Sequence, residues 1–246
     1  MTVDDNQTFC ACPNRMDPPA FHVSSQQIET ISVRTGPFSV DQGGSVGGTI
    51  AVRTSSPSEK PFGRFYGYYG SYDYFATGIT GGYPFSENQR GLGGFYYQRG
   101  GVYKDGSDVP FTQLPGTNYQ QQFFDETAFE VFTTEVKAVS VLKNDATVTV
   151  NYAFQDAQDV LYPGLQMDAL SDTMNRASIV FRLPVVMDIA DDIQTSFGFS
   201  HVDHDMRDSF RTSINNMAGA FASRGYFMRT QAESLLINGR LEFNKA

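Results

Sequence analysis

The chain has 246 residues, a formal net charge of −9 and a mean hydropathy of −0.32, although it contains 21 Phe and 13 Tyr. Its acidic balance argues against nucleic acid as a partner, because proteins that bind nucleic acid carry basic patches. No apolar run approaches the roughly 18 residues of a membrane-spanning helix. Many aromatic residues with a modest mean hydropathy are typical of strands that are apolar on one face only, as in an outer-membrane β-barrel.

The first 57 residues are punctuated by Gly and Pro and contain two short expected strands, Ile28–Thr35 and Gly48–Thr54. The Gly-rich stretch between them favours tight turns, but it lacks the Gly-Lys-Ser/Thr ending of a phosphate-binding loop. The N-terminus has neither the basic nor the apolar region of a signal peptide. We therefore expect the chain to be a fragment with sequence missing at both ends.

The sulfur-containing residues form two short pairs. The two cysteines, Cys10 and Cys12, are too close in sequence for an unstrained disulfide, so a disulfide scaffold is not expected. Cys12 and Met16 combine a thiol and a thioether, and His204 and Met206 add an imidazole and a second thioether. Such soft donors select Cu(I) over hard cations, although Cys and Met more often fill gaps in a core.

From residue 61 onward, alternating aromatic and polar residues predict about eight antiparallel strands. The expected strands are 62–70, 73–84, 90–101, 127–142, 146–156, 176–187, 193–206 and 234–243, with long polar loops at 102–124, 157–175 and 207–223. Tight turns at one end and long loops at the other indicate an outer-membrane barrel. A soluble sandwich would also alternate, but it would not need three long loops at the same end.

Strand parity assigns side chains to the two faces of the sheet, because successive residues point in opposite directions. The expected lipid-facing set comprises Val148, Val150, Tyr152, Phe154, Ile179, Phe181, Phe197 and Phe199. In strand 193–206 the opposite, polar phase continues to His204 and Met206, which should therefore face the lumen. If the first strand rises from the N-terminal region, this seventh strand also rises, so both residues lie at its extracellular end.

Two segments resemble the end of the plug domain of TonB-dependent outer-membrane receptors. Residues 31–40 (ISVRTGPFSV) and 47–54 (GGTIAVRT) match its I-x-V-x-x-G-P-x-S and G-G-x-I-x-x-x-T segments in order. In that family the barrel strands follow the plug directly. The resemblance implies that residues 1–57 are the C-terminal part of a plug domain and residues 58–246 the N-terminal strands of a transmembrane β-barrel, an all-β fold.

The resemblance extends to the copper receptors of this family. Residues 12–19 (CPNRMDPP) look like their C-x-x-x-M-D-P-P segment, 203–206 (DHDM) like their D-H-x-M segment, and 162–169 (YPGLQMDA) like one of their loops. The implied copper site consists of Cys12, Met16, His204 and Met206. Copper as Cu(I) would be the transported ligand, the bacterial outer membrane the location, and outer-membrane lipid and the TonB energy-coupling complex the partners, with the TonB contact motif outside this chain.

Other functions stay open at the level of sequence. The plug segments are shared by receptors for siderophores and other metal chelates, and a surface binding protein without transport would have the same strands. Zn²⁺ also accepts Cys and His ligands, although thioether suits it poorly. No Ser/His/Asp arrangement is brought together by the expected strands, so we do not expect an enzyme. About eight strands cannot close the roughly 22-stranded barrel of an outer-membrane transporter, so this chain alone should not transport.

Overall fold

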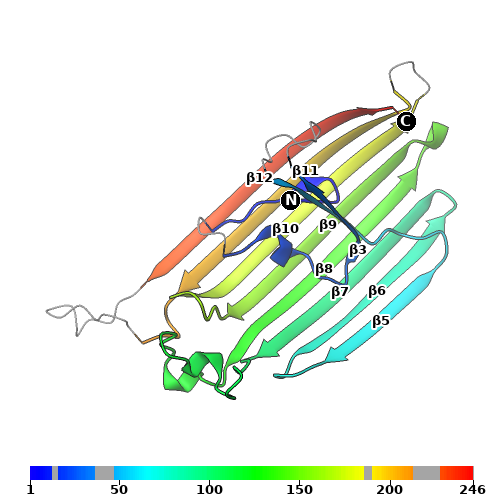
Figure 1. Cartoon of the computed structure of the whole chain (residues 1–246). Coiled ribbons are helices and arrows are strands. Elements are labelled where there is room, and N and C mark those ends of the chain that lie inside the picture. The colour runs from blue at the N-terminus through cyan, green and yellow to red at the C-terminus, as the bar shows by residue number, and fades with distance from the viewer. Residues whose placement is uncertain (13–15, 37–46, 186–189, 213–227, 246) are drawn as a thin grey trace.

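The structure, a computed structural model, describes residues 1–12, 16–36, 47–185, 190–212 and 228–245. It consists of two β-sheets, one of eight strands in the order β12-β11-β10-β9-β8-β7-β6-β5 and one of four in the order β2-β1-β4-β3. The small sheet lies across one face of the large, curved sheet (Figure 1). Within these residues, no helix has both the length and the apolar character needed to cross a membrane.

The large sheet is antiparallel throughout, as the alternation predicted. Its strands are β5 (Phe62–Tyr69), β6 (Phe75–Ser86), β7 (Gln89–Gly101), β8 (Thr127–Val141), β9 (Thr147–Val160), β10 (Asp168–Pro184), β11 (Asp192–Arg207) and β12 (Arg229–Asn244). The small sheet contains β1 (Thr2–Val3), β2 (Asn6–Gln7), β3 (Ile28–Thr35) and β4 (Gly48–Thr54). The helical turns are η1 (Pro19–His22), η2 (Phe111–Gln113), η3 (Gln121–Phe123) and η4 (Lys143–Asp145).

The connections differ at the two ends of the large sheet. At one end, here called the turn end, strands are joined through residues 87–88, 142–146 and 185–191. At the other, the loop end, residues 70–74, 102–126, 161–167 and 208–228 make the connections, and short helical turns gather there (Figure 1). In the N-terminal segment, residues 1–57, the described residues 1–12, 16–36 and 47–57 lie against the inner face of the sheet between these two ends.

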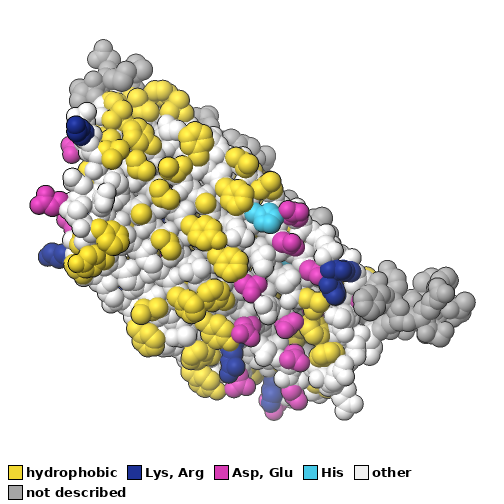
Figure 2. Space-filling view, turned by 180° about the vertical axis from the view of Figure 1, so that it is seen from behind, with side chains coloured by type: hydrophobic (Ala, Val, Ile, Leu, Met, Phe, Trp, Pro, Cys, Tyr) yellow, Lys and Arg dark blue, Asp and Glu magenta, His cyan; other side chains and the backbone are white. Residues whose placement is uncertain are grey.

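Alternation along the strands separates an apolar outer face from a polar inner face. Predicted outward residues that are 36–60 % exposed are Val150, Tyr152, Ile179, Phe181, Phe197 and Phe199. The inward neighbours Asn151 and Gln155 are buried under the N-terminal segment. Figure 2 shows hydrophobic side chains over much of the outer face, with acidic side chains gathered toward the loop end. The predicted register of the outward set is therefore confirmed.

The loop expected at residues 157–175 is wrong in extent. β9 continues to Val160 and β10 begins at Asp168, so only residues 161–167 connect them. In this region the outward positions Asp156 and Gln158 are polar, while the inward Ala157 is fully buried. Here the hydropathy alternation is reversed relative to the middle of the strand. For that reason the sequence predicts a loop where the structure has strand.

Other differences concern the ends of elements. β12 starts five residues earlier than expected, at Arg229, and β1 and β2 are too short to leave a periodic pattern. The Gly-rich stretch between β3 and β4, the proline at position 13, the turn at position 188 and most of the loop expected at 207–223 lie outside the described residues.

Hydrogen bonds from polar side chains join the N-terminal segment to the inner face of the large sheet. Asn6 donates through Nδ2 to the carbonyl oxygens of Ala177 (3.1 Å) and Phe199 (2.8 Å). Lys137 on β8 donates through Nζ to the Thr54 carbonyl oxygen (3.1 Å) and hydroxyl oxygen (2.7 Å). A buried polar group without a partner costs about 1–3 kcal/mol, so these contacts fix the segment in one position.

Asn6 can approach β11 only because Gly198 has no side chain. A methyl group at Gly198 would overlap the side-chain oxygens of Asn6 and Asn238. We expect Gly198→Ala to lower the free energy of unfolding of the full-length protein by about 1–3 kcal/mol, as overpacking does. Gly63→Ala is the matched control, since nothing lies within 4 Å of a Cβ there. Equal denaturant midpoints for the two variants would contradict the close approach of Asn6.

Candidate metal centre

Cys12 and Met16 belong to a loop that is held by the carboxyl group of Asp17. Its Oδ2 accepts a hydrogen bond from the backbone N–H of Ala11 (2.6 Å) and its Oδ1 one from the N–H of Cys12 (2.9 Å). The next residue, Pro18, has extended backbone angles, and η1 begins directly after it. Proline at the start of a helical turn has a favourable fixed φ and lacks only an N–H that would be unpaired. The sequence therefore ends the loop sharply after Asp17.

Strand β11 brings His204 and Met206 to the inner face near the loop end. Both side chains are fully buried. In the register between β10 and β11, His204 lies opposite Asp172 and Met206 opposite Ala169. The small side chain of Ala169 leaves space at this point for the longer thioether side chain of Met206.

Three of the four residues predicted from sequence pack in one cluster, and the fourth, His204, stands two residues from Met206 on β11. Cys12 and Met206 form a single cluster in which Met16 also packs. A ring nitrogen of His204 and carboxyl oxygens of Asp17 and Asp172 lie within 4.8 Å of one another, and Asp17 itself bonds to Cys12. The N-terminal segment and β11 thus bring together donors from opposite ends of the chain.

The hydrogen bonding of His204 defines which ring nitrogen is available. Its Nδ1 lies 2.6 Å from Oδ2 of Asp172, and the other carboxyl oxygen lies 2.8 Å from Nε2 of His22. Because an ionised carboxylate only accepts hydrogen bonds, Nδ1 of His204 carries the hydrogen, and in the neutral ring the lone pair then belongs to Nε2. That Nε2 atom is buried and finds no hydrogen-bond partner among the described residues. An orientation fixed by a carboxylate on the far nitrogen is the usual state of a metal-binding histidine.

The carboxyl groups at the centre hold neighbouring groups by hydrogen bonds. Both oxygens of Asp17 accept backbone N–H groups, and both oxygens of Asp172 accept imidazole N–H groups. The donors that remain are the sulfur atoms of Cys12, Met16 and Met206 and the Nε2 atom of His204. This set is soft, and it suits Cu(I) better than an oxygen-seeking cation.

Sequence reasoning missed Asp17, His22 and Asp172. Asp17 carried a usable signal, because an Asp directly before two prolines is typical of a loop that closes on its own backbone. Asp172 was hidden in the stretch that read as a loop. Its contact with His22 depends on docking of the N-terminal segment, and nothing in the local pattern indicates it.

Loop residues cover the centre from the loop end. The Tyr162 hydroxyl donates to the carbonyl oxygen of Met16 (3.1 Å). Arg211 binds the carboxyl group of Asp168 through Nε (2.8 Å) and NH2 (2.6 Å), and its guanidinium lies 4.3 Å from the centre of the Tyr119 ring. Burial first, and then the nearby carboxyl groups, raise the pKa of both Tyr119 and Tyr162. The hydroxyl groups of Tyr119 and Tyr162 therefore stay protonated and can donate hydrogen bonds.

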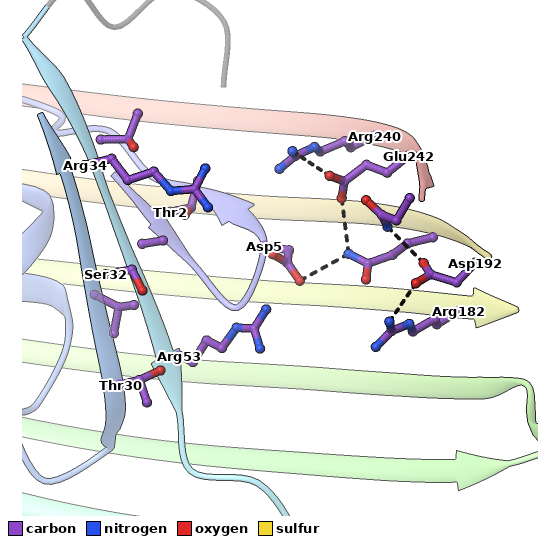
Figure 3. A pocket seen from close by; sticks show the side chains of 15 residues that line it. Thr2, Asp5, Thr30, Ser32, Arg34, Arg53, Arg182, Asp192, Arg240 and Glu242 are labelled. Atoms are coloured by element: carbon purple, nitrogen blue, oxygen red, sulfur yellow. Dashed lines mark hydrogen bonds and ion pairs between the residues drawn. The ribbon is translucent and has the colours of Figure 1, made fainter. Parts of the chain in front are cut away.

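Away from this centre, a cavity of about 470 Å³ lies between the small sheet and β10–β12 toward the turn end. Figure 3 shows its charged lining, in which Arg182 pairs with Asp192 (2.7 Å) and Arg240 with Glu242 (2.7 Å). The lining residues include no Cys, Met or His. This cavity is polar and does not offer the donors of a soft metal site.

The imidazole–carboxylate pair of His204 and Asp172 also has the form of a general base with its orienting group. Nucleophilic catalysis requires a hydroxyl or thiol that hydrogen-bonds to the other ring nitrogen. Among the described residues, none makes that bond to Nε2 of His204. The geometry fits a ligand atom better than a catalytic base.

Comparison with known proteins supports the fold. No protein-family model and no curated protein matches the sequence. Among solved structures, the chain is similar to the copper transporter OprC, with a TM-score of 0.76 and 19% identity over 97% of this chain and 34% of that chain. It also matches the pyoverdine outer membrane receptor FpvA from Pseudomonas aeruginosa PAO1, with a TM-score of 0.43 and 15% identity over 90% of this chain and 44% of that chain. The chain spans about a third of the length of the copper transporter and has the fold of that part.

Loss of the Asp17 carboxylate should loosen the loop that carries Cys12. In Asp17→Asn, the amide oxygen can replace only one acceptor, and the NH2 group faces a second N–H. We expect amide exchange at Ala11 and Cys12 to become faster by an amount that corresponds to about 1–3 kcal/mol. Asp5→Asn serves as the control, because among the described residues the hydrogen bond of the Asp5 carboxyl group is a 3.4 Å contact with Gln194. Unaltered exchange at both amides in Asp17→Asn would show that the carboxylate does not hold this loop.

Proposed function

We propose that this chain is part of a TonB-dependent outer-membrane receptor that binds copper and imports it into the bacterial cell. In this proposal residues 1–57 are the C-terminal part of the plug and residues 58–246 the N-terminal strands of the barrel. One observation carries the proposal: Nε2 of His204 is buried and unpaired among the described residues, and Met206, two residues further along β11, packs in a cluster with Cys12 and Met16. The likeness in fold to a copper transporter supports it.

The chemistry of the donors favours copper in the Cu(I) state. One thiolate, two thioethers and one neutral imidazole would surround the ion, with Cys12 and Met16 from the plug and His204 and Met206 from the barrel. Thioether sulfur is a good ligand for Cu(I) and a poor one for Zn²⁺. Mg²⁺ and Ca²⁺ require oxygen ligands, and the carboxyl oxygens at this centre already accept hydrogen bonds.

The outer face is suited to a lipid environment. Large apolar side chains such as Ile79, Val150, Phe197 and Ile237 are exposed on strands spread across the large sheet. In a barrel wall this face would contact the hydrocarbon core, and the acidic side chains toward the loop end (Figure 2) would lie near the head groups. We therefore infer that outer-membrane lipid is a partner of this chain.

Import would require energy, because the N-terminal segment blocks the route past the copper site. Hydrogen bonds from Asn6, Lys137 and Asn151 join this segment to the inner face of the sheet. Moving the segment aside breaks several buried hydrogen bonds, each costing about 1–3 kcal/mol when its partner is left unpaired. An external source of work, the TonB complex, fits this requirement.

The copper assignment is tested by Cu(I) titration of the full-length receptor against a chromogenic chelator. We expect Cys12→Ala, His204→Ala and Met206→Leu each to weaken binding by about tenfold to 100-fold or more. Met174→Leu is the matched control, since Met174 is equally buried on β10 but packs in a separate cluster. The Met-to-Leu exchange conserves volume and costs less than about 1.5 kcal/mol in stability.

Wild-type affinity in both Cys12→Ala and His204→Ala would contradict the copper site. The alternatives would then be a receptor for a siderophore or other metal chelate, or a surface binding protein without transport. Measuring copper accumulation in cells with and without a functional TonB complex separates import from binding alone.

The membrane assignment is tested by lysine substitution on the two faces of β9. We expect Val150→Lys to destabilise the full-length protein by about 2–4 kcal/mol if the residue lies near the bilayer midplane. Thr149→Lys is the control because Thr149 lines a polar cavity on the inner face. Asn151 is unsuitable, since it lies beside Lys137 in the register. Equal unfolding midpoints in lipid vesicles would contradict burial of Val150 in lipid.

A further inference from the structure

A single carboxyl group connects the N-terminal segment to the candidate copper ligand of the large sheet. Asp172 on β10 accepts one bond from Nε2 of His22 (2.8 Å) and one from Nδ1 of His204 (2.6 Å). All three side chains are at most 1 % exposed. His22 belongs to η1 of the N-terminal segment, and His204 to β11, so Asp172 joins two parts of the fold that must separate if the segment moves.

His22 lies on the same short stretch of chain as Cys12 and Met16. Residues 17–21 separate Met16 from His22, and Pro18 and Pro19 restrict the backbone there in φ. Gln155 donates to the carbonyl oxygen of Phe21 (3.1 Å), next to His22. Docking of His22 on Asp172 therefore also determines where the two sulfur ligands of the segment lie.

We propose that His22 is a positioning residue for copper: through Asp172 it fixes the ring of His204, so that docking of the N-terminal segment is itself part of the copper site. This inference rests on the proposed function. Without His22, one oxygen of Asp172 loses its buried partner, and the carboxyl group is free to turn away from His204. The ring of His204 would then no longer be held in one orientation.

Thermodynamic linkage makes this connection reciprocal. If docking of His22 raises the affinity for copper, then bound copper must stabilise the docked segment by the same factor. Displacement of the segment would remove Cys12, Met16 and the support of His204 together. Copper held tightly in the docked state would thus be released when the segment is withdrawn, which an importer requires.

The test uses the full-length receptor and the variants His22→Phe and Asp172→Asn. Phenylalanine keeps a ring beside Phe21, whose centroid lies 5.7 Å from that of His22, but it removes the N–H donor. Asn151→Leu is the matched control: it breaks another bond between the large sheet and the N-terminal segment, that to Asp4 (2.8 Å), away from the copper ligands. Cu(I) affinity and amide exchange of residues 19–35 are measured for each protein with and without Cu(I), and X-ray absorption reports the nitrogen and sulfur ligands.

In the wild type, Cu(I) should slow amide exchange in residues 19–35. His22→Phe should bind Cu(I) about tenfold more weakly and Asp172→Asn about tenfold to 100-fold more weakly, the usual range for groups that orient a metal ligand. His22→Phe should also lose the copper-dependent slowing and show a weaker nitrogen contribution in its X-ray absorption. Asn151→Leu should keep both the wild-type affinity and the copper-dependent slowing.

Wild-type affinity and wild-type copper-dependent slowing in His22→Phe would overturn the inference while leaving the copper site in place. An equal loss of affinity in Asn151→Leu would also overturn it, because general loosening of the segment would then suffice. Absence of Cu(I) binding by the wild-type receptor would instead overturn the proposed function. Amide exchange without copper shows whether Asp172→Asn folds. If it does not fold, the result for His22→Phe alone tests the inference.

Discussion

Hydrogen bonding between the N-terminal segment and the inner face of the large sheet is the constraint on which the rest of the structure depends. The inner face carries buried polar and charged side chains such as Lys137, Asn151 and Arg176, which an apolar filling could not satisfy. Instead the segment supplies backbone carbonyl groups and short polar side chains that meet them. A segment fixed by many such directional contacts can occupy only one position, and that position determines the candidate metal centre.

At the candidate metal centre, the carboxyl groups of Asp17 and Asp172 hold neighbouring residues in position. Asp17 closes the loop of Cys12, and Asp172 orients His204. Each of these carboxyl oxygens already accepts a hydrogen bond, so the donors proposed for the ligand are the soft ones. The selectivity proposed for copper thus follows from the removal of the hard donors as much as from the presence of sulfur. A carboxylate left without these partners would offer Zn²⁺ or Ca²⁺ an alternative.

The two halves of the interface between the segment and the sheet differ in character. Toward the loop end, Arg211, Asp168 and Tyr162 bind one another and cover a closely packed centre. Toward the turn end, the interface contains a polar cavity lined by ion pairs (Figure 3). Ion pairs beside solvent stabilise weakly, whereas the buried contacts near the loop end are costly to break.

The sequence by itself determined the strand periodicity, the outward set on β9 to β11, the inward phase of His204 and Met206, and the pairing of soft donors. These features are local, because alternation along a strand is encoded within a few residues. It did not determine the full length of β9 and β10, where Ala157 inside and Asp156 and Gln158 outside reverse the hydropathy pattern. Only the tertiary structure decided that His22 and Asp172 meet and that Nε2 of His204 is left unpaired among the described residues. Those contacts join distant segments, and their formation depends on docking that no local pattern records.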